Sequence, residues 1–338
     1  MKLYAGIDLH SNNSFLSIID EMGKQVYKKR LSNDLPYILT ELSTYAENLY
    51  GIVVESTFNW YWLVDGLKEK GFKVHLANPS AIQQYSGIKH TNDESYATWL
   101  AQMLRMRLLP EGYIYPKDER PIRDLLRKRS QLVRHRTTNI LSIQNIITRQ
   151  TGRQLKGDDI KSLDSNKLLE ILEGNQEVFM AANSNLHILR ELSRDIKEIE
   201  KYVLKKVKRK AQFKNLHTVP GIGDILGLTI MLETGDVSRF ATVGDYSSYC
   251  RCVDSKRLSN GKKKGENNRK NGNKYLAWAF VEAAHYAIRK EPAIKRFYQK
   301  KSSKTKQVVA IKAIAHKLAR ACYYIMRDGV SYDLTKGF

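Results

Sequence analysis

The chain begins with three short apolar runs separated by polar turns, a pattern that commits its N-terminal region to consecutive β-strands. The runs occupy residues 3–9, 15–19 and 25–31. Their composition and spacing are typical of a β-meander. Asp8 stands among apolar neighbours near the end of the first run. A buried carboxylate is costly unless something compensates it, so Asp8 is either a ligand for a divalent cation or simply a residue of the strand-end turn.

Helical and extended patterns alternate after this meander. Helical periodicity at 35–49 precedes a buried run at 51–55, and a helix at 59–70 precedes a strand at 71–77. An amphipathic helix follows at 92–109. The order β-β-β-α-β-α-β predicts an α/β layered domain.

Two long helices are expected in the middle of the chain. The first, at 119–150, is rich in arginine, and the second, at about 185–212, has apolar residues at the three- and four-residue spacing of a packed seam. A looser polar stretch at 151–183 separates them. We expect a coiled-coil-type helical arm at 119–212 that binds nucleic acid and also offers a surface for oligomerisation.

The C-terminal region, 213–338, is expected to be mostly helical, with helices at about 274–289 and 305–326. A basic segment at 255–274 precedes these helices. It contains eight Lys or Arg residues and a single acid, Glu266. Asn, Gly and Ser fill its gaps, which favours a mobile loop. These shifts of composition divide the chain into three domains, 1–118, 119–212 and 213–338.

The charge of the chain indicates its class of partner. Its formal net charge is +22 and its pI about 9.7. Such an excess points to a polyanion, most simply nucleic acid. No run approaches the ~20 apolar residues that span a bilayer, and no lipidation motif or basic amphipathic anchor stands out, so no membrane is expected as a partner. Asp8 and His10 stand where a signal peptide would be apolar, and the three cysteines lack zinc-finger spacing. We therefore expect a cytoplasmic protein with reduced thiols.

Three carboxylates fall where a metal site would form. Asp8 and Glu55 end predicted strands, and Asp93 begins the following helix. The carboxyl ends of strands in open α/β sheets are where sites are built. Hard oxygen ligands suit Mg²⁺ or Mn²⁺, and metal ions can activate and stabilise the oxygens of a phosphodiester undergoing displacement. Scattered acids are common in a chain with 35 of them, so position rather than composition carries this interpretation.

These motifs resemble a known family. Ala5-Gly-Ile-Asp-Leu-His10, Val54-Glu55 and Asp93-Glu-Ser-Tyr-Ala-Thr-Trp-Leu-Ala101 are similar to the RuvC-like N-terminal domain of the DEDD insertion-sequence transposases. Pro110-Glu-Gly-Tyr-Ile-Tyr-Pro-Lys-Asp-Glu-Arg-Pro121 and the basic helix after it continue the match. This family is related to the Piv DNA invertase, and some of its members are guided by a bridge RNA. The resemblance implies an α/β RNase H-like (RuvC-like) domain, the helical arm, and a mostly α C-terminal transposase domain.

One position departs from the family pattern. The fourth carboxylate of the family follows the third by three residues, one helical turn on, and here that position is Tyr96. A phenol is a poor Mg²⁺ ligand and is neutral at pH 7. Three alternatives stay open: three carboxylates suffice, metal binding is weakened, or this copy is inactive.

The resemblance also selects a nucleophile. Ser259, in Arg257-Leu-Ser-Asn-Gly-Lys-Lys263, aligns with the catalytic serine of the family. Without the family, a Ser-Asn-Gly turn is ordinary loop chemistry, and Ser255 is a rival. The implied mechanism is a composite site in which the metal domain of one subunit helps to activate the serine of another, giving a phosphoserine–DNA intermediate and strand exchange.

A turn and several basic residues complete the candidate sites. Val219-Pro-Gly-Ile-Gly223 resembles the hairpin of a helix-hairpin-helix motif, whose backbone N–H groups can meet phosphate oxygens, although a plain helix-joining turn has the same pattern. The expected nucleic-acid contacts are Arg123, Arg127, Arg134, Gly221, Gly223, Lys262, Lys263, Lys264, Arg269 and Lys270.

Three functions compete on this sequence. The first is a serine-dependent DNA transposase or site-specific recombinase, acting on element ends and target DNA with a structured guide RNA. As a recombinase it would pair DNA ends as a homodimer or homotetramer, associated with the bacterial nucleoid. The second is a metal-dependent, structure-selective nuclease similar to a Holliday-junction resolvase. The third is a catalytically impaired copy that binds nucleic acid without cutting it, which Tyr96 favours.

Overall fold

The computed structural model describes residues 1–82, 93–207, 210–253, 256–266 and 271–338, with the backbone alone at positions 80, 82, 93, 94, 256–258, 263 and 266. The chain divides into two compact units, Met1–Lys117 and Asp118–Phe338. The arm and the C-terminal region that composition separates, 119–212 and 213–338, both lie in the second unit.

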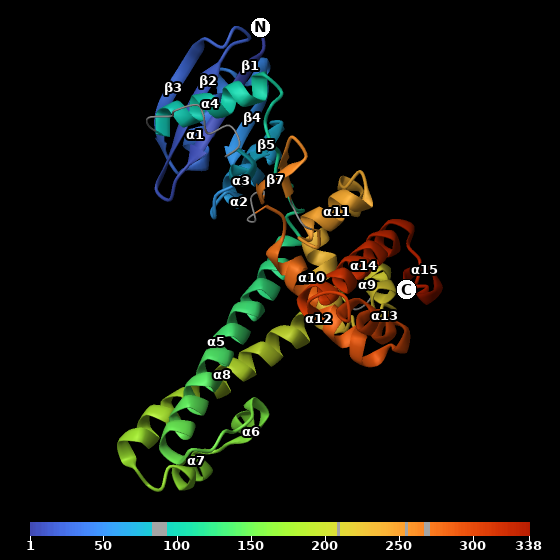
Figure 1. The fold of residues 1–338 in the computed structure, drawn as a ribbon. Coiled ribbons are helices and arrows are strands. Elements are labelled where there is room, and N and C mark those ends of the chain that lie inside the picture. Colours follow the sequence, from blue (N-terminus) through green and yellow to red (C-terminus); the bar gives the residue numbers. More distant parts are fainter. Residues whose placement is uncertain (83–92, 208–209, 254–255, 267–270) are drawn as a thin grey trace. The chain divides into compact units, whose positions relative to one another are not determined.

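The first unit is built on a five-stranded mixed sheet (Figure 1). Its strands are β1 (Leu3–Leu9), β2 (Asn13–Ile19), β3 (Gln25–Ser32), β4 (Leu49–Glu55) and β5 (Val74–Ala77). Their order in the sheet is β3-β2-β1-β4-β5. The meander β1-β2-β3 is antiparallel, whereas β4 lies parallel to β1 and β5 parallel to β4. The parallel strands β1 and β4 therefore end at the same edge of the sheet.

Side chains alternate between two apolar layers along these strands. Ile52 and Val54 of β4 pack in the layer formed with α1 (Leu35–Ser43) and α2 (Tyr61–Glu69). Val53, between them, packs in the layer formed with α4 (Asp93–Arg105) on the opposite face. This is the period-two alternation of a strand buried on both faces. The short helix α3 (Pro79–Ile82) follows β5.

The second unit is helical apart from one hairpin in its described part. Its helices are α5 (Arg120–Thr151), α6 (Gly157–Ser162), α7 (Ser165–Ile171), α8 (Gln176–Val207), α9 (Ala211–Leu216), α10 (Asp224–Thr234), α11 (Val243–Tyr249), α12 (Lys274–Lys290), α13 (Pro292–Ser302), α14 (Gln307–Asp328) and α15 (Leu334–Gly337). The long helices α5 and α8 run side by side as an arm in Figure 1. Ile143 and Ile147 of α5 pack with Leu186 and Leu189 of α8, so the predicted seam is present.

Helices α6 and α7 pack on the arm, and the helices from α9 onward form a bundle around α10. Every residue of α10 from Leu226 to Thr234 is buried, so the helix has no solvent face beyond its first turn. Leu276, Phe280 and Ala283 of α12 belong to the same core. Among the residues that the structure describes, no helix combines the length and the apolar character needed to cross a membrane.

The structure differs from the expected elements at several places. The helix expected at 35–49 ends at Ser43, because a strand begins at Leu49. The arm's second helix begins at Gln176 rather than near 185, and the side chain of Asn175 accepts a hydrogen bond from Val178 N at this start. Helices α6 and α7 occupy part of the stretch expected to be loose.

Candidate functional site

Two carboxylates meet at the edge of the first unit's sheet. The last residues that β1 and β4 pair with each other are Ile7 and Val54, and Asp8 and Glu55 come one position later on each strand. Because side chains alternate, both lie on the same face as Val53, the face covered by α4. Asp8 is 4% exposed. A hydrogen bond joins the two carboxyl groups.

The environment opposes two negative charges at this point. Burial, the nearby charge of Asp8 and the hydrogen bond to its carboxyl together raise the pKa of Glu55 to about 7. A carboxyl group whose pKa is raised by burial and by a second acid is a common feature of functional sites. The pair holds a proton that a solvent-exposed pair would release.

Helix α4 brings Tyr96 to the same pair. A Cβ at Gly6 would lie 2.1 Å from the carbonyl oxygen of Ala97, so only glycine lets α4 pack this closely against β1. The Tyr96 hydroxyl donates a long hydrogen bond, 3.4 Å, to Glu55 Oε1. Burial and the two carboxylates raise the pKa of Tyr96 well above its usual range, so the phenol stays neutral. A neutral hydroxyl therefore occupies the position that the family pattern gives to a carboxylate.

Asp93 stands one helical turn before Tyr96, as the first residue of α4. Its side chain lies outside the described part of the structure. Among the side chains that are described, no group of three His, Cys, Asp or Glu residues is arranged to hold a metal ion. Asp8 and Glu55 thus supply two hard oxygen ligands, and their closeness suits a cation, whose positive charge would replace the retained proton.

Residues that the sequence did not single out hold the turn beside Asp8. Asn33 Nδ2 and Asn59 Nδ2 both donate to the carbonyl oxygen of His10, at 2.9 and 3.0 Å. His10 Nε2 lies 3.4 Å from Asp8 Oδ2. No local sequence pattern marks the two asparagines, because their partner is 23 and 49 residues away in the chain.

The basic segment forms a β-hairpin rather than the expected loop over its described residues. Its strands are β6 (Lys256–Ser259) and β7 (Lys262–Glu266). Asn260 and Gly261 connect them with φ values of 49° and 69°, the two positive φ angles of a type I′ turn. An Asn-Gly pair between two short strands is the strongest local hairpin signal, and it forms this turn in spite of the positive charge of both strands.

Ser259 is exposed at the end of β6 and pairs directly with Lys262. Residues opposite one another in an antiparallel pair point to the same face, so Lys262 shares a face with Ser259. The register of the hairpin shifts between Arg257 and Leu258, so this alternation does not extend to Lys264. Lys262 and Lys264 are both exposed. The side chain of Lys263, and Arg269 and Lys270 altogether, lie outside the described residues.

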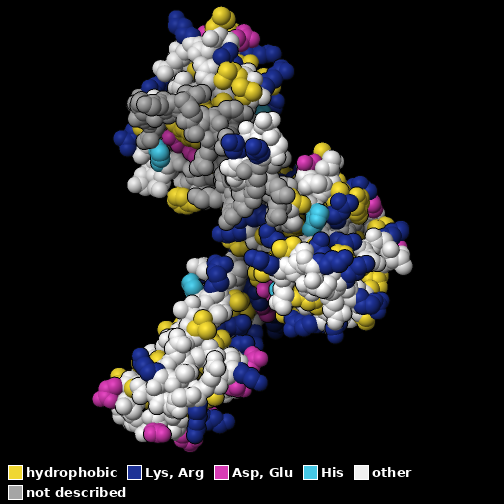
Figure 2. All heavy atoms as spheres, viewed as in Figure 1, with side chains coloured by type: hydrophobic (Ala, Val, Ile, Leu, Met, Phe, Trp, Pro, Cys, Tyr) yellow, Lys and Arg dark blue, Asp and Glu magenta, His cyan; other side chains and the backbone are white. Residues whose placement is uncertain are grey.

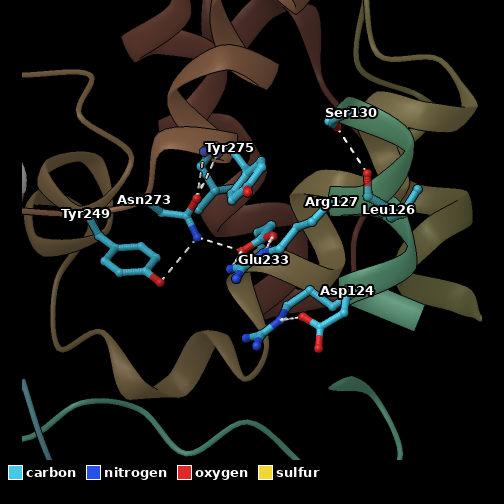
Figure 3. A network of polar contacts seen from close by, with 10 residues as sticks. Asp124, Leu126, Arg127, Ser130, Glu233, Tyr249, Asn273 and Tyr275 are labelled. Carbon is cyan, nitrogen blue, oxygen red and sulfur yellow. Dashed lines mark hydrogen bonds and ion pairs between the residues drawn. The ribbon is translucent and has the colours of Figure 1, made fainter. Parts of the chain in front are cut away.

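The arginines of α5 lie in different environments. Arg123 is buried, at 4% exposure, whereas Arg134 is exposed. Arg127 donates from Nε and Nη2 to the two carboxylate oxygens of Glu233, at 2.6 and 2.7 Å, as Figure 3 shows. Its guanidinium also lies 4.7 Å from the Tyr275 ring centroid. Arg127 therefore has a structural role within the second unit.

Glu233 connects this ion pair to the residues that follow the hairpin. Asn273 Nδ2 donates to Glu233 Oε2 at 2.8 Å (Figure 3). The Asn273 Oδ1 accepts from the backbone N–H groups of Tyr275 and Leu276 and so caps α12. Asn273 N also donates to the carbonyl oxygen of Tyr249 at 2.6 Å. The chain on either side of the hairpin is thus tied to one buried carboxylate.

The glycines of the Pro-Gly-x-Gly turn have separate roles. Gly221 has φ +85°, and a Cβ there would lie 2.2 Å from the carbonyl oxygen of Ala283, so this glycine permits the turn to pack on α12. Gly223 caps α10 without a side chain, and a Cβ there would meet nothing within 4 Å. Only Gly223 leaves open space for a ligand.

Basic side chains are abundant on the second unit. Figure 2 shows Lys and Arg spread over much of the visible face of the C-terminal helices. Together with the formal net charge of +22, this surface favours a polyanionic partner.

Two family models match the chain. One covers the candidate metal-binding residues, and the other covers the candidate nucleophile. A transposase model of the DEDD, IS110 type matches residues 5–150, which include Asp8, Glu55, Asp93 and Tyr96. A model described as transposase IS116/IS110/IS902 family matches residues 213–299, which include Ser259.

Curated relatives agree with these matches. The chain is 24% identical over 291 residues to a probable family 20 transposase of Pseudomonas aeruginosa, covering 80% of this chain and 82% of that one. It is 23% identical over 297 residues to the transposase for insertion sequence element IS1111A of Coxiella burnetii, covering 84% and 77%. An uncharacterized 43.6 kDa protein of insertion element IS110 from Streptomyces coelicolor is 24% identical over 119 residues, 35% of this chain and 29% of that one. The two family models and these relatives, taken together, place the chain in the IS110/IS116/IS902 family of transposases.

Proposed function

We propose that this transposase is a DNA recombinase that cuts and joins strands through Ser259, assisted by a divalent-metal site on Asp8, Glu55 and Asp93. The observation that carries the proposal is the carboxyl pair at the ends of two adjacent parallel strands, with Tyr96 donating to it. The strand order β3-β2-β1-β4-β5 supports an RNase H-like, RuvC-like domain.

Mg²⁺ or Mn²⁺ is the proposed metal, since the described ligands are hard oxygen donors. When bound, such an ion lowers the pKa of an attacking hydroxyl and stabilises charge on a leaving oxygen. Asp8 and Glu55 would hold two ligand positions, and the hydrogen bond of the metal-free pair keeps the two carboxyl groups close together. The Tyr96 hydroxyl stabilises the charged form of Glu55 without adding a charge of its own.

Ser259 is the proposed nucleophile. Its Oγ forms a bond to phosphorus while the bond from phosphorus to a deoxyribose oxygen breaks, and the serine proton is lost to solvent or to the leaving oxygen. A hydroxyl of another strand then attacks the phosphoserine and restores Ser259. Lys262 shares the hairpin face with Ser259, so it attracts the phosphodiester and offsets the charge that develops on its oxygens. Lys264 is exposed on the same strand and adds to the positive charge of the hairpin.

Further contacts follow from the exposed cations. Arg134, Lys262 and Lys264 are proposed to bind phosphates of DNA or of a structured guide RNA, as are Lys263, Arg269 and Lys270. The open backbone at Gly223 is proposed as a helix-hairpin-helix-like phosphate contact. Recombination pairs DNA ends, so a homodimer or homotetramer is the proposed assembly.

Covalent capture tests the proposal. The protein is incubated with element-end DNA, guide RNA and Mg²⁺, and protein–DNA adducts are resolved on a denaturing gel. We expect an adduct that Ser259→Ala abolishes and that Asp8→Asn reduces at least about 100-fold, because the serine loses its activation. Ser303→Ala, at an exposed serine of the same unit, serves as the matched control and should leave the adduct unchanged.

Tyr96 supports a second candidate, a copy impaired at its metal site. In that case only Tyr96→Asp protein forms the adduct. Cleavage products without an adduct, unaffected by Ser259→Ala, would instead establish a metal-dependent nuclease and refute the serine mechanism.

A further inference from the structure

A cavity of about 570 Å³ lies beside the Pro-Gly-x-Gly turn of the second unit. The turn and the first residues of α10 form one wall, and α12 forms the other. Neither the carboxyl pair nor the serine hairpin contributes a residue to it. Its function is therefore separate from the proposed chemistry.

Helix α12 lines this cavity with a single stripe of side chains. The four lining residues are spaced by four positions along one face: Trp278, Glu282, Tyr286 and Lys290. The residues of the opposite face are buried in the core of the bundle. Trp278 is 38% exposed and Tyr286 44% exposed, so two large rings border the cavity and face water.

An exposed indole at the wall of a cavity suits a flat, unsaturated ligand. Trp278 makes no ring contact or hydrogen bond with any residue in the described ranges. One side of Tyr286 is covered, because the Arg289 guanidinium lies 4.7 Å from its ring centroid. Trp278 is therefore the available stacking surface, and Tyr286 forms the far wall.

The polar groups of the cavity favour a ligand with hydrogen-bond donors over a bare phosphate. Glu282 is half-buried between the two rings and pairs with no side chain that the structure describes. Arg129 is already paired with Glu200, with Arg129 Nε 2.8 Å from Glu200 Oε1. Asp224 Oδ1 lies 3.0 Å from His217 Nε2. An unpaired carboxylate accepts hydrogen bonds from N–H groups and repels phosphate.

We propose that this cavity binds a single unpaired nucleobase, preferentially guanine, stacked on Trp278 and held by Glu282. The N1–H and N2–H groups of guanine match the two oxygens of one carboxylate, and the Lys290 ammonium can meet the flanking phosphate. A base within a duplex is stacked on both faces and paired at this edge, so only a single-stranded or extruded base can enter. The inference rests on the proposed nucleic-acid binding of the chain and adds to it a site that reads a base.

The test uses full-length protein and labelled eight-residue oligothymidylates that carry one central dG, dA, dC or dT. Affinity is measured by fluorescence anisotropy, and occupancy of the cavity by quenching of tryptophan emission. Trp278 is the single tryptophan of the second unit, since the other three are Trp60, Trp62 and Trp99. We expect the dG oligomer to bind roughly tenfold more tightly than oligothymidylate and to quench Trp278, because a bidentate pair between a side chain and one base discriminates against other bases by about this factor.

Variants separate the two contacts. Trp278→Ala should lower the affinity for the dG oligomer about tenfold and remove the quenching, whereas Trp278→Phe should keep most of the affinity. Glu282→Gln should abolish the preference for dG over dA while leaving oligothymidylate binding unchanged. Tyr202→Ala, at an exposed tyrosine of α8, is the matched control and should alter neither readout. Circular dichroism checks that each variant is folded.

Oligouridylates with a central rG form the second arm. Equal affinity for the DNA and RNA oligomers would show that the base alone is recognised. Higher affinity for the RNA oligomer would show that the ligand is an unpaired base of an RNA strand. Both outcomes support a base-binding site. Oligomer binding that is unaffected by Trp278→Ala and Glu282→Gln overturns this inference but leaves the proposed function intact. Failure to bind any oligomer or duplex overturns both.

Discussion

At the scale of residues, the candidate metal site depends on where Asp8 and Glu55 stand in the strand alternation. Each comes one residue after the last position at which β1 and β4 pair with each other, and both face α4. A shift of one position would turn either carboxylate into the other apolar layer. The strand-end location of both acids could be predicted from the sequence, because it depends on local patterns alone. The contact of Tyr96 with Glu55 could not, since it depends on how closely Gly6 lets α4 approach the sheet.

The raised pKa of Glu55 predicts how the metal-free protein responds to pH. The folded-state pKa of about 7 lies above the ordinary value of 4.5, so the folded state holds a proton that the unfolded chain has released within this window. The free energy of unfolding therefore falls as pH rises from about 4.5 through 7. Glu55→Gln keeps the shape of the side chain and removes the titrating group. It should therefore reduce this decrease in the free energy of unfolding by about 1–2 kcal/mol, a figure that allows for solvent screening of a partly exposed carboxyl.

Chemical denaturation at pH 5, 6, 7 and 8 with a chelator measures this effect. Glu47→Gln, at an exposed acid of the same unit, is the control and should keep the wild-type slope. An unchanged slope in Glu55→Gln would show that the proton is held elsewhere.

The buried Glu233 makes a second prediction at this scale. Glu233 is 2% exposed, and it accepts two hydrogen bonds from Arg127 and one from Asn273. Glu233→Ala leaves both donors without their acceptor and should lower the free energy of unfolding of the second unit by about 3 kcal/mol. Glu191→Ala, which removes an exposed partner of Arg194, should cost less than about 1 kcal/mol. Equal losses in a denaturant titration would show that the Glu233 network contributes no more than a surface pair.

At the scale of elements, the apolar strands and the long helices could be predicted from the sequence, whereas the basic hairpin was not expected. The expected first strand, 3–9, coincides with β1, and the long basic helix expected at 119–150 differs from α5 by one residue at each end. The first is an apolar run bounded by polar turns and the second has helical periodicity, and both are local properties of the sequence. The β6–β7 hairpin cannot be predicted from apolar periodicity, because its strands are mostly lysine, arginine and small residues rather than alternating apolar ones. Its formation depends on the backbone of Asn260 and Gly261.

The turn geometry makes a prediction about activity. Gly261 has φ +69° with open space around it, so Gly261→Ala introduces backbone strain and no clash. An alanine in the left-handed backbone conformation costs about 1 kcal/mol, which is a factor of roughly five in an equilibrium constant. We expect the formation of the Ser259–DNA adduct to fall by about that factor. Gly174→Ala is the matched control, at φ +75° and also in open space, within the arm. It should cost similar strain and leave the adduct unchanged; an equal fall in both variants would mean that strain acts through stability and not through the hairpin.

At the scale of the whole molecule, each unit has its own apolar cores. The cores around the sheet draw on residues of Met1–Lys117 alone, and those of the arm and the bundle draw on Asp118–Phe338 alone. The proposed division of labour follows the same boundary, since the carboxyl pair belongs to the first unit and Ser259 to the second. A ligand of one unit should therefore stabilise that unit selectively.

Scanning calorimetry of the full chain tests this independence. We expect two unfolding transitions, because units with separate cores unfold as separate cooperative blocks. Mg²⁺ should raise the midpoint of one transition only, with a stabilisation of about 2.7 kcal/mol at a hundredfold excess over its Kd. Asp8→Asn should abolish that shift, and Glu233→Ala should lower the other midpoint without affecting the response to Mg²⁺. A single transition that both changes move together would mean that the units are thermodynamically coupled, and that occupation of the carboxyl site is felt by the serine hairpin through the fold.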